Sequence, residues 1–124
     1  MNLLLDSHLG IWWIEANAWV KCEWLEPMLD RSNAVCVSAA SALEIEIKKR
    51  SGRLPFGPTL VEVAIQYRFA PVPVSASDAA RAGSLKRNHI DPFDRMLVAQ
   101  SLEHRMVLVT DDALLTSAPG IRTL

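Results

Sequence analysis

The sequence predicts an α/β fold in which a central parallel sheet of four to five strands lies between two layers of helices. Short apolar runs at 2–5, 34–37 and 107–109 have the composition of strands that are buried on both faces of a sheet. Segments with apolar residues at helical spacing separate these runs. Because helices that alternate with buried strands pack on both faces of a parallel sheet, we expect a three-layer α/β/α architecture.

The length and composition indicate one packed domain. The chain has 124 residues, which is enough for a single core, and we expect residues 1–124 to form one domain. Hydrophobic residues make up 50% of the chain, which argues against a disordered tail. The net charge of -1 argues against a protein that holds nucleic acid by bulk positive potential. A polyanionic substrate would need local basic residues or a bound metal ion.

The N-terminal apolar run ends at Asp6 and is too short for a signal peptide. No later segment approaches the roughly 18 apolar residues of a membrane span, so we expect a soluble, cytoplasmic protein. Cys22 and Cys36 lack a CxxC spacing. We expect both thiols to remain reduced, with Cys36 in the core.

The segment 8–24 has apolar residues at helical spacing, and we expect it to form two helices that are broken near Asn17. All 4 tryptophans of the chain lie between positions 12 and 24. Trp12 and Trp13 would point about 100° apart on a helix, so both cannot face one core. One of them is therefore expected to cover a partner surface.

The second apolar run, 34–37, leads directly into a helical segment at 38–48. Ser41 and Glu44 have the spacing of a capping box, which would give Glu44 a structural role at the start of this helix. A basic cluster follows, and such a cluster is most often a solvated face. It also contains the best candidates for contacts with phosphate groups, which are Lys48, Lys49 and Arg53, with Arg87 later in the chain.

The middle of the chain predicts further helices and an edge strand. Segment 59–67 is expected to be an amphipathic helix, and 69–74 a short strand that two prolines favour at a sheet edge. Ser75 and Asp78 have capping-box spacing and open a helix of small residues at 79–83. Asp78 shows that an acid at a helix start need have no role beyond capping.

The stretch 89–100 places two carboxylates at the start of a helix that is expected to run to about position 105. Asp91 suits the N-cap, Pro92 the first helical position and Asp94 the third. Both acids complement the helix dipole at this end. From this stretch alone, capping and catalysis are both open interpretations of Asp94.

Carboxylates follow the three buried strands. Asp6 follows the first, and Glu44 lies one turn into the helix after the second. The third, at 107–109, leads through Thr110 into two aspartates, before a short helix and a small strand at 121–124. Parallel strands present their carboxyl ends at one edge, where ligands bind. Unneutralised carboxylates a few ångströms apart repel by on the order of 1 kcal/mol or more at an effective dielectric constant near 20, so a cation is expected among them.

An all-oxygen donor set suits Mg²⁺ or Mn²⁺. Zinc is disfavoured, because His8, His89 and His104 are scattered and have no HExxH-like spacing. A hard cation among carboxylates can activate water and neutralise the charge that builds on a phosphodiester. The absence of a GxSxG elbow, a Walker loop and a GxGxxG motif argues against serine hydrolases and nucleotide-cofactor enzymes.

Four stretches match one known family in order and at similar separations. They are 3–8, 38–45, 89–100 and 108–112. With Lys48 and 52–54 between them, the chain resembles the PIN-domain ribonucleases, and specifically the VapC-type toxins of bacterial toxin–antitoxin pairs. The run HxDPFDRxLxAQ is the most specific part of this resemblance. The family often has tryptophan where this chain has Leu43, and we interpret this departure as a packing change.

The resemblance implies a PIN-like fold and a metal-dependent endoribonuclease that leaves 5′-phosphate and 3′-hydroxyl ends. The family's acidic positions correspond to Asp6, Glu44, Asp94 and Asp112. The carboxylates of Asp6, Asp94 and Asp112 would hold one or two Mg²⁺ or Mn²⁺ ions, while Glu44 would complete the site or orient the attacking water. The family spacing after threonine favours Asp112 over Asp111. Supporting roles are implied for Asp91, Asp111, Ser7 and Thr110.

The resemblance also implies partners. A small DNA-binding antitoxin of the VapB-like kind would place an apolar and basic tail in the cleft, and the toxin would form a homodimer. Trp12 and Trp13 are candidates for the antitoxin groove. Two other functions are open from the sequence: a catalytically silent PIN-like interaction module, and a receiver-type phosphoacceptor domain. The receiver type expects an acidic pair after the first strand, whereas Ser7 follows Asp6 here.

Overall fold

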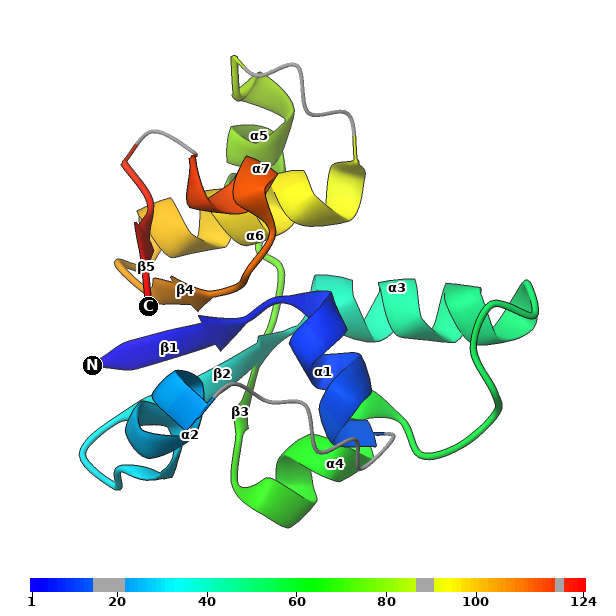
Figure 1. The fold of residues 1–124 in the computed structure, drawn as a ribbon. Helices are drawn as coiled ribbons and strands as arrows, with labels where there is room; N and C mark the ends of the chain where they lie inside the picture. Colours follow the sequence, from blue (N-terminus) through cyan, green and yellow to red (C-terminus); the bar gives the residue numbers. More distant parts are fainter. Residues whose placement is uncertain (15–21, 87–90, 118–119) are drawn as a thin grey trace.

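The computed structural model describes residues 1–14, 22–86, 91–117 and 120–124 (Figure 1). Its sheet has five strands, all paired in parallel, in the order β3-β2-β1-β4-β5. The strands are β1 (Asn2–Leu5), β2 (Ala34–Ser38), β3 (Ala70–Val72), β4 (Val107–Val109) and β5 (Arg122–Thr123). The predicted central parallel sheet is therefore confirmed, with β1 at its centre.

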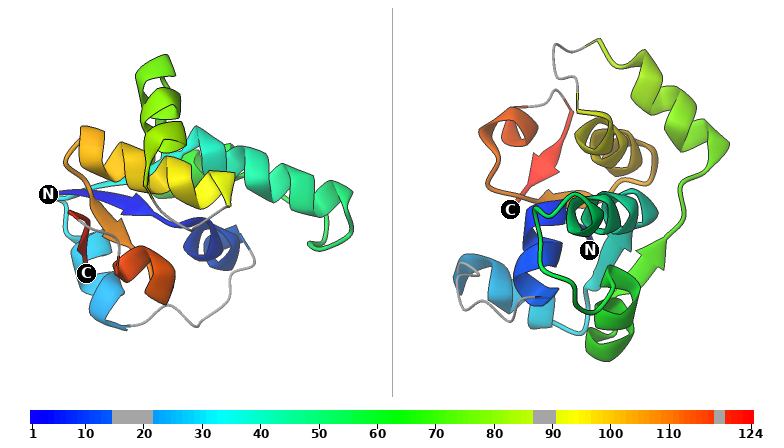
Figure 2. Two further views of the ribbon diagram at one scale, coloured as in Figure 1. Left: turned by 90° about the horizontal axis from the view of Figure 1, so that it is seen from above. Right: turned by 90° about the vertical axis from the view of Figure 1, so that its right-hand side faces the viewer.

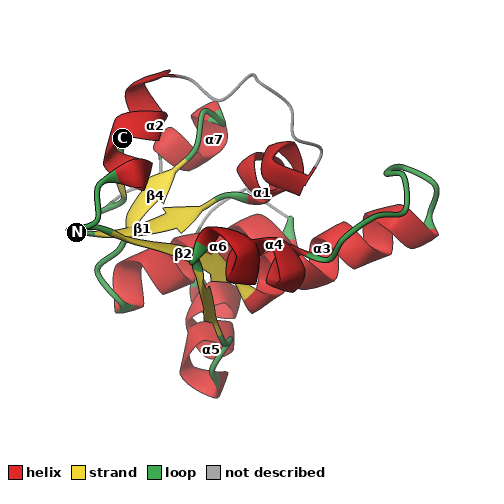
Figure 3. Cartoon of the chain, turned by 90° about the horizontal axis from the view of Figure 1, so that it is seen from below, coloured by secondary structure: helices red, strands yellow, loops and turns green. Residues whose placement is uncertain are grey.

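Helices cover both faces of the sheet. Those in the described residues are α1 (Ser7–Ile14), α2 (Cys22–Leu29), α3 (Ala39–Arg50), α4 (Leu60–Tyr67), α5 (Ala76–Ser84), α6 (Pro92–Glu103) and α7 (Ala113–Thr116). In Figure 1, α5, α6 and α7 lie above the sheet, and α1, α2 and α4 lie below it. Helix α3 extends outward past the ends of the strands, as the views in Figures 2 and 3 also show. This arrangement confirms the predicted three-layer fold.

The alternation of side chains along the strands divides the core into two parts. Leu3 and Leu5 of β1 point to the face that is covered by α1, α2, α3 and α4, and Leu4 points to the face covered by α6 and α7. Their neighbours follow the same alternation, since Leu4 pairs with Cys36 and Leu108. The strands β1, β2 and β4 are thus buried on both faces, which is why their sequences are almost continuously apolar.

The edge position of β3 agrees with its prolines. Pro71 lies within β3, which pairs only with β2 in the described sheet. Because proline cannot donate a hydrogen bond to a neighbouring strand, an edge strand is where it is tolerated. Within the part of the chain that the structure describes, no helix is both long enough and apolar enough to cross a membrane.

Two predicted helix starts differ in outcome. The capping box of Ser75 and Asp78 is confirmed, with the helix beginning at once, at Ala76, rather than at 79. The predicted capping box of Ser41 and Glu44 is wrong, because α3 begins three residues earlier, with Ser38 as its N-cap. Ser38 ends β2 and caps α3 at the same time, so the strand runs into the helix without a loop. The expected break near Asn17 lies outside the described residues.

The core predicts a clear contrast between two leucines on helices. Leu97 of α6 is fully buried, whereas Leu43 of α3 is exposed. Leu97→Ala should lower the free energy of unfolding by about 2–5 kcal/mol, because it removes buried methyl groups and leaves a cavity. Leu43→Ala, the matched control, should change it by less than about 0.5 kcal/mol. Urea unfolding measures both, and equal effects would contradict the described core.

Candidate active site at the carboxyl edge of the sheet

The carboxyl ends of β1, β2 and β4 lie at one edge of the sheet. In register, Leu5 of β1 lies between Val37 and Val109, so the three strands end at the same level. In Figure 1 the chain runs from the arrowheads of β1, β2 and β4 into α1, α3 and α7, and the yellow start of α6 lies toward the same, right-hand side. The segments that carry the predicted acids therefore meet at this edge, as expected for a parallel sheet.

Asp6 is the most buried of the predicted acids, with a relative exposure of 3%. Its Oδ1 accepts hydrogen bonds from the backbone N–H groups of His8, at 2.7 Å, and Leu9, at 3.3 Å. Asp6 thus caps α1, since these are the second and third residues of the helix. Its Oδ2 accepts a hydrogen bond from the hydroxyl of Thr110. One carboxylate therefore joins the end of β1, the start of α1 and the end of β4.

Burial raises the pKa of the Asp6 carboxyl above its ordinary value of 3.8. The hydrogen bonds from Thr110 and from the backbone of His8 and Leu9 oppose this increase without cancelling it. The protein's hydrogen-bond donors offset only part of the cost of burying this charged carboxylate. A further positive charge beside it would therefore stabilise the ionised form.

Thr110 connects Asp6 to Asp112. Its Oγ1 donates to Asp6 and accepts a hydrogen bond from the backbone N–H of Asp112 at 3.1 Å. Asp112 is half-buried and caps α7 by accepting from the N–H of Leu114 at 2.9 Å. Asp111 is exposed, and within the described chain it makes neither of these contacts. Asp112 is thus joined to Asp6 through Thr110, and its assignment as the fourth acid stays a prediction.

Glu44 lies on α3, and it reaches the same edge through a contact between two serines. The hydroxyl of Ser7 donates to the hydroxyl of Ser41 at 3.0 Å, and both side chains are buried. Ser7 follows Asp6, and Ser41 lies about one turn before Glu44 on α3, so this contact fixes the spacing of the two acids. Glu44 itself is 8% exposed. Its Oε2 lies 3.0 Å from Nζ of Lys48.

The second oxygen of Glu44 is a buried acceptor that no donor of the described chain reaches. Among the described residues, Glu44 Oε1 has no hydrogen-bond donor within reach. Such groups are rare in folded proteins and mark a place where a ligand, an ion or water belongs. Because Ser38 and not Ser41 caps α3, Glu44 also has no capping role that would explain its burial.

The start of α6 faces Glu44 across a cavity of about 440 Å³. Its lining combines acidic, basic and apolar side chains, and consists of Glu44, Ile47, Lys48, Arg53, Asp91, Pro92 and Phe93. Asp91 is the N-cap of α6, as predicted, and accepts from the N–H groups of Phe93 and Asp94. Asp94 is half-buried in the first turn. The cap therefore fixes the position of Asp94 in the first turn of α6.

The predicted acids share the edge, but they do not form a ready metal site. Within the described residues, no three His, Cys, Asp or Glu side chains are grouped closely enough to hold one metal ion. Protein donors account for this in part, since Asp6 and Asp112 accept hydrogen bonds and Glu44 pairs with Lys48. The atoms that could bind a metal are all carboxylate oxygens, and Glu44 Oε1 has no partner among the described residues. These two features fit a hard divalent cation.

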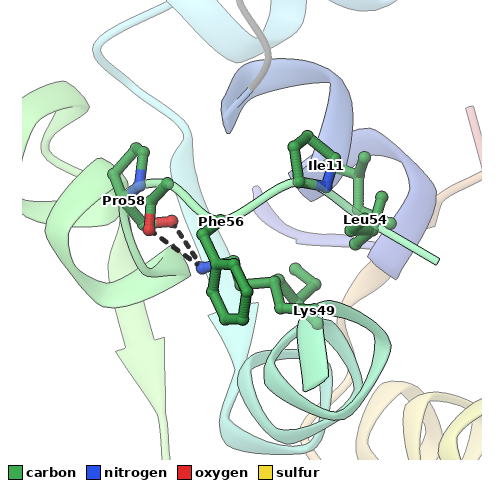
Figure 4. Close-up of a pocket in the computed structure, with 8 residues that line it drawn as sticks. Ile11, Lys49, Leu54, Phe56 and Pro58 are labelled. Atoms are coloured by element: carbon green, nitrogen blue, oxygen red, sulfur yellow. Dashed lines mark hydrogen bonds between the residues drawn. The ribbon is translucent and has the colours of Figure 1, made fainter. Parts of the chain in front are cut away.

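The predicted phosphate contacts divide into two groups. Lys48 and Arg53 line the cavity beside Glu44. Lys49 does not, because its side chain is 4% exposed and its Nζ donates to Glu46. The same Nζ also donates to the carbonyl oxygens of Gly57 and Pro58, as the dashed lines in Figure 4 show. This ammonium fastens the loop after α3 and presents no charge at the surface.

The side chains of three predicted contact residues lie outside the part of the chain that the structure describes. Arg87 lies outside the described residues. The backbone of Trp12 and Trp13 belongs to α1, while their side chains lie outside the described part. Their assignment to phosphate or antitoxin contacts stays a prediction.

Two residues of the motif in 89–100 have roles that the sequence analysis missed. Gln100 is fully buried, accepts from the hydroxyl of Ser38 at 2.5 Å and donates to the carbonyl of Pro73 at 3.3 Å. It therefore ties α6 to the cap of α3. Arg95 donates to the carbonyl oxygens of Ala82, Gly83 and Leu85, which holds the end of α5 against α6. The signal for Gln100 is its amide inside an apolar helical face.

Comparison with known proteins places the chain among related folds. The model of the PIN domain family matches residues 3–120. The VapBC2 complex of Rickettsia felis, bound to a promoter DNA fragment, contains a chain with a TM-score of 0.73 and 17% identity, over 100% of this chain and 98% of that one. A search of curated proteins gave no match.

Two further solved structures have the same fold. DNA-bound VapBC of Salmonella typhimurium has a TM-score of 0.72 and 19% identity, over 100% of this chain and 97% of that one. The PIN domain endonuclease Utp24 has a TM-score of 0.55 and 19% identity, over 99% of this chain and 83% of that one. At these identities the likeness concerns the fold.

The burial of Asp6 predicts a pH-dependent effect of Asp6→Asn on the metal-free protein. The folded carboxyl holds its proton more tightly than the unfolded one, so ionisation lowers stability as the pH rises from 3.8 through the raised pKa. Asn keeps an acceptor for the cap of α1 and does not ionise. The free energy of unfolding of Asp6→Asn, measured with urea in EDTA, should exceed that of wild type near pH 7.5, and the difference should shrink toward about pH 4.

Asp30 supplies a control of opposite sign. It is exposed, and hydrogen bonds from Ser32 lower its pKa. Asp30→Asn should therefore not gain stability relative to wild type as the pH rises. If the difference for Asp6→Asn is independent of pH, the account of its burial is wrong.

Proposed function

The chain belongs to the PIN domain family, and we propose that it is a metal-dependent endoribonuclease that acts as the toxin of a toxin–antitoxin pair. The observation that carries the proposal is the buried Asp6 carboxylate at the carboxyl edge, which Thr110 joins to Asp112 and which lies next to the Ser7–Ser41 contact with the helix that carries Glu44. We further propose that residues 1–124 form one domain.

We assign the metal to the carboxylates of Asp6, Asp94 and Asp112, with Glu44 completing the site. When bound, Mg²⁺ or Mn²⁺ supplies activation of water and neutralisation of the charge that develops on the scissile phosphodiester. The all-oxygen donor set supports this choice of ion. Thr110 and Ser7 position the site, since Thr110 bonds Asp6 and Asp112, and Ser7 bonds the helix that carries Glu44.

Other roles that we propose at this edge concern the attacking water and the phosphates of the substrate. We propose that Glu44 orients the attacking water and accepts its proton, and the support is that its Oε1 is buried without a donor among the described residues. We also propose that Lys48 and Arg53, which line the same cavity, bind backbone phosphates on either side of the cleavage point. The net charge of -1 means that these local cations, with the metal, must attract the RNA.

The partner we propose is a small VapB-like antitoxin, with the toxin as a homodimer in the cytoplasm. The support is that solved structures with this fold include VapBC from Rickettsia felis and Salmonella typhimurium.

Trp12 and Trp13 remain our candidates for the antitoxin groove. Trp13→Ala should weaken antitoxin binding, and an unchanged affinity would count against that assignment.

A catalytically silent PIN-like module is the alternative that an observation favours, since the described acids do not form a ready three-ligand group. Membership in the PIN family leaves the receiver-type alternative without support. A measurement of metal binding separates the nuclease from the silent module.

Metal binding should raise the melting temperature. With Mn²⁺ at about a hundredfold excess over its dissociation constant, linkage adds about 2.7 kcal/mol, which corresponds to a shift of about 5 °C or more for a chain of this size. Asp6→Asn should lose most of this shift. A wild-type melting temperature that does not respond to Mn²⁺ or Mg²⁺ would favour the silent module.

The two neighbouring aspartates after β4 provide a matched test of activity. Asp112→Asn should lower the rate of RNA cleavage in Mg²⁺ by more than about 100-fold, because it removes a proposed ligand. Asp111→Asn removes the same charge one residue away, from an exposed side chain, and should keep the rate within about threefold. Equal losses would contradict the assignment, and so would Asp6→Asn protein that cleaves as fast as wild type.

A further inference from the structure

Lys48 forms an ion pair with Glu44, which is a proposed active-site residue. Lys48 lies one helical turn after Glu44 on α3, and its Nζ is 3.0 Å from Oε2. The side chains are 19% and 10% exposed. Partial burial means that salt screens this pair less than a pair on the surface.

The pair occupies one oxygen of a carboxylate whose other oxygen has no donor among the described residues. Among the described residues, therefore, only one of the two Glu44 oxygens has a partner, the Lys48 ammonium. A divalent cation at Glu44 would meet the Lys48 ammonium at close range, and like charges at that distance repel. The two cations compete for the same carboxylate.

The cavity gives Lys48 another place to bind. Lys48 and Arg53 line it together with Glu44. The turn after α3 holds Arg53 near Lys48, because the carbonyl of Lys48 accepts from the N–H groups of Arg53, at 2.9 Å, and Leu54, at 3.2 Å. Two neighbouring cations in one cavity suit a backbone phosphate, which offers several acceptor oxygens to both.

We propose that Lys48 is an internal competitor of the metal ion: its ammonium holds Glu44 until a phosphate of the RNA backbone enters the cavity and takes Lys48 over. This inference rests on the proposed function, and it adds a coupling between the two ligands of the site. Binding of the phosphodiester frees Glu44 for the cation, and binding of the cation frees Lys48 for the phosphate. By linkage, each ligand tightens the other by the same factor.

Lys49 provides the contrast on the same helix. Its ammonium donates to Glu46 and to the carbonyl oxygens of Gly57 and Pro58 and is buried. None of these partners is a proposed metal ligand. Lys49 should therefore be indifferent to the metal, whereas Lys48 should respond to it.

The test by substitution uses Mn²⁺ alone, measured by calorimetry or electron paramagnetic resonance on the full chain. Lys48→Met keeps the aliphatic stem and removes the charge, and it should tighten Mn²⁺ binding by about fivefold or more. Lys48→Arg keeps the charge and should stay close to wild type. Arg50→Gln removes one charge from an exposed residue of the same helix and should change the affinity by less than about twofold.

The same variants test the coupling to a phosphodiester. A 2′-O-methyl hexanucleotide serves as a probe that is not hydrolysed. It should tighten Mn²⁺ binding to wild type, and it should do so by a smaller factor in Lys48→Met. Equal factors in the two proteins would overturn the proposal.

A measurement on the wild-type protein keeps the proposal testable if Lys48→Met does not fold. The reactivity of each lysine toward reductive methylation is followed by mass spectrometry with and without Mg²⁺. Saturating Mg²⁺ should increase the labelling of Lys48 about threefold or more and leave that of Lys49 unchanged, because only Lys48 is displaced from its carboxylate.

The outcomes separate this inference from the function on which it rests. If neither Mn²⁺ nor Mg²⁺ binds the wild-type protein, the proposed metal-dependent activity fails. If the metal binds and RNA is cleaved, but Lys48→Met binds Mn²⁺ no more tightly than wild type, or Mg²⁺ leaves Lys48 labelling unchanged, only the competition by Lys48 is wrong.

Discussion

The Asp6 carboxylate lies at the end of the central strand, and the geometry of the whole edge depends on its hydrogen bonds. One oxygen caps α1 through His8 and Leu9, and the other binds Thr110 at the end of β4. The buried charge makes these contacts necessary, since an ionised carboxylate without donors is costly in the interior. The ends of two strands and the start of a helix are thereby joined at one carboxylate.

The same device recurs at the other acids. Asp91 caps α6, and Asp112 caps α7, so helix starts fix where the acidic segments sit. Caps and ion pairs keep mutually repelling carboxylates in place in the absence of a cation. Within the described residues, no three acidic side chains lie close enough together to bind one metal ion. This agrees with the arrangement, because each hydrogen-bond donor on a carboxylate competes with a metal ion for its oxygens. Metal binding then becomes an exchange of partners, which is where Lys48 enters.

Sequence patterns predicted the sheet, its edge strand and the cap at Asp91, because these depend on local periodicity and on chemistry within a few residues. They failed at Ser41, since the choice between Ser38 and Ser41 as cap depends on where β2 ends, which the neighbouring strands decide. Lys49 could not be distinguished from Lys48 either. Their difference arises from the loop at 57–58, which folds back over Lys49 alone.

If the carboxylates of this edge hold a divalent cation, diffraction from crystals that contain Mn²⁺ should locate it. The anomalous signal of Mn²⁺ identifies the ion without reference to activity. We expect a peak bound by carboxylate oxygens of Asp6, Asp94 and Asp112, with Glu44 bound directly or through water and Lys48 turned away from it. A crystal saturated with Mn²⁺ whose only peaks lie elsewhere on the molecule would show that this edge does not hold the cation.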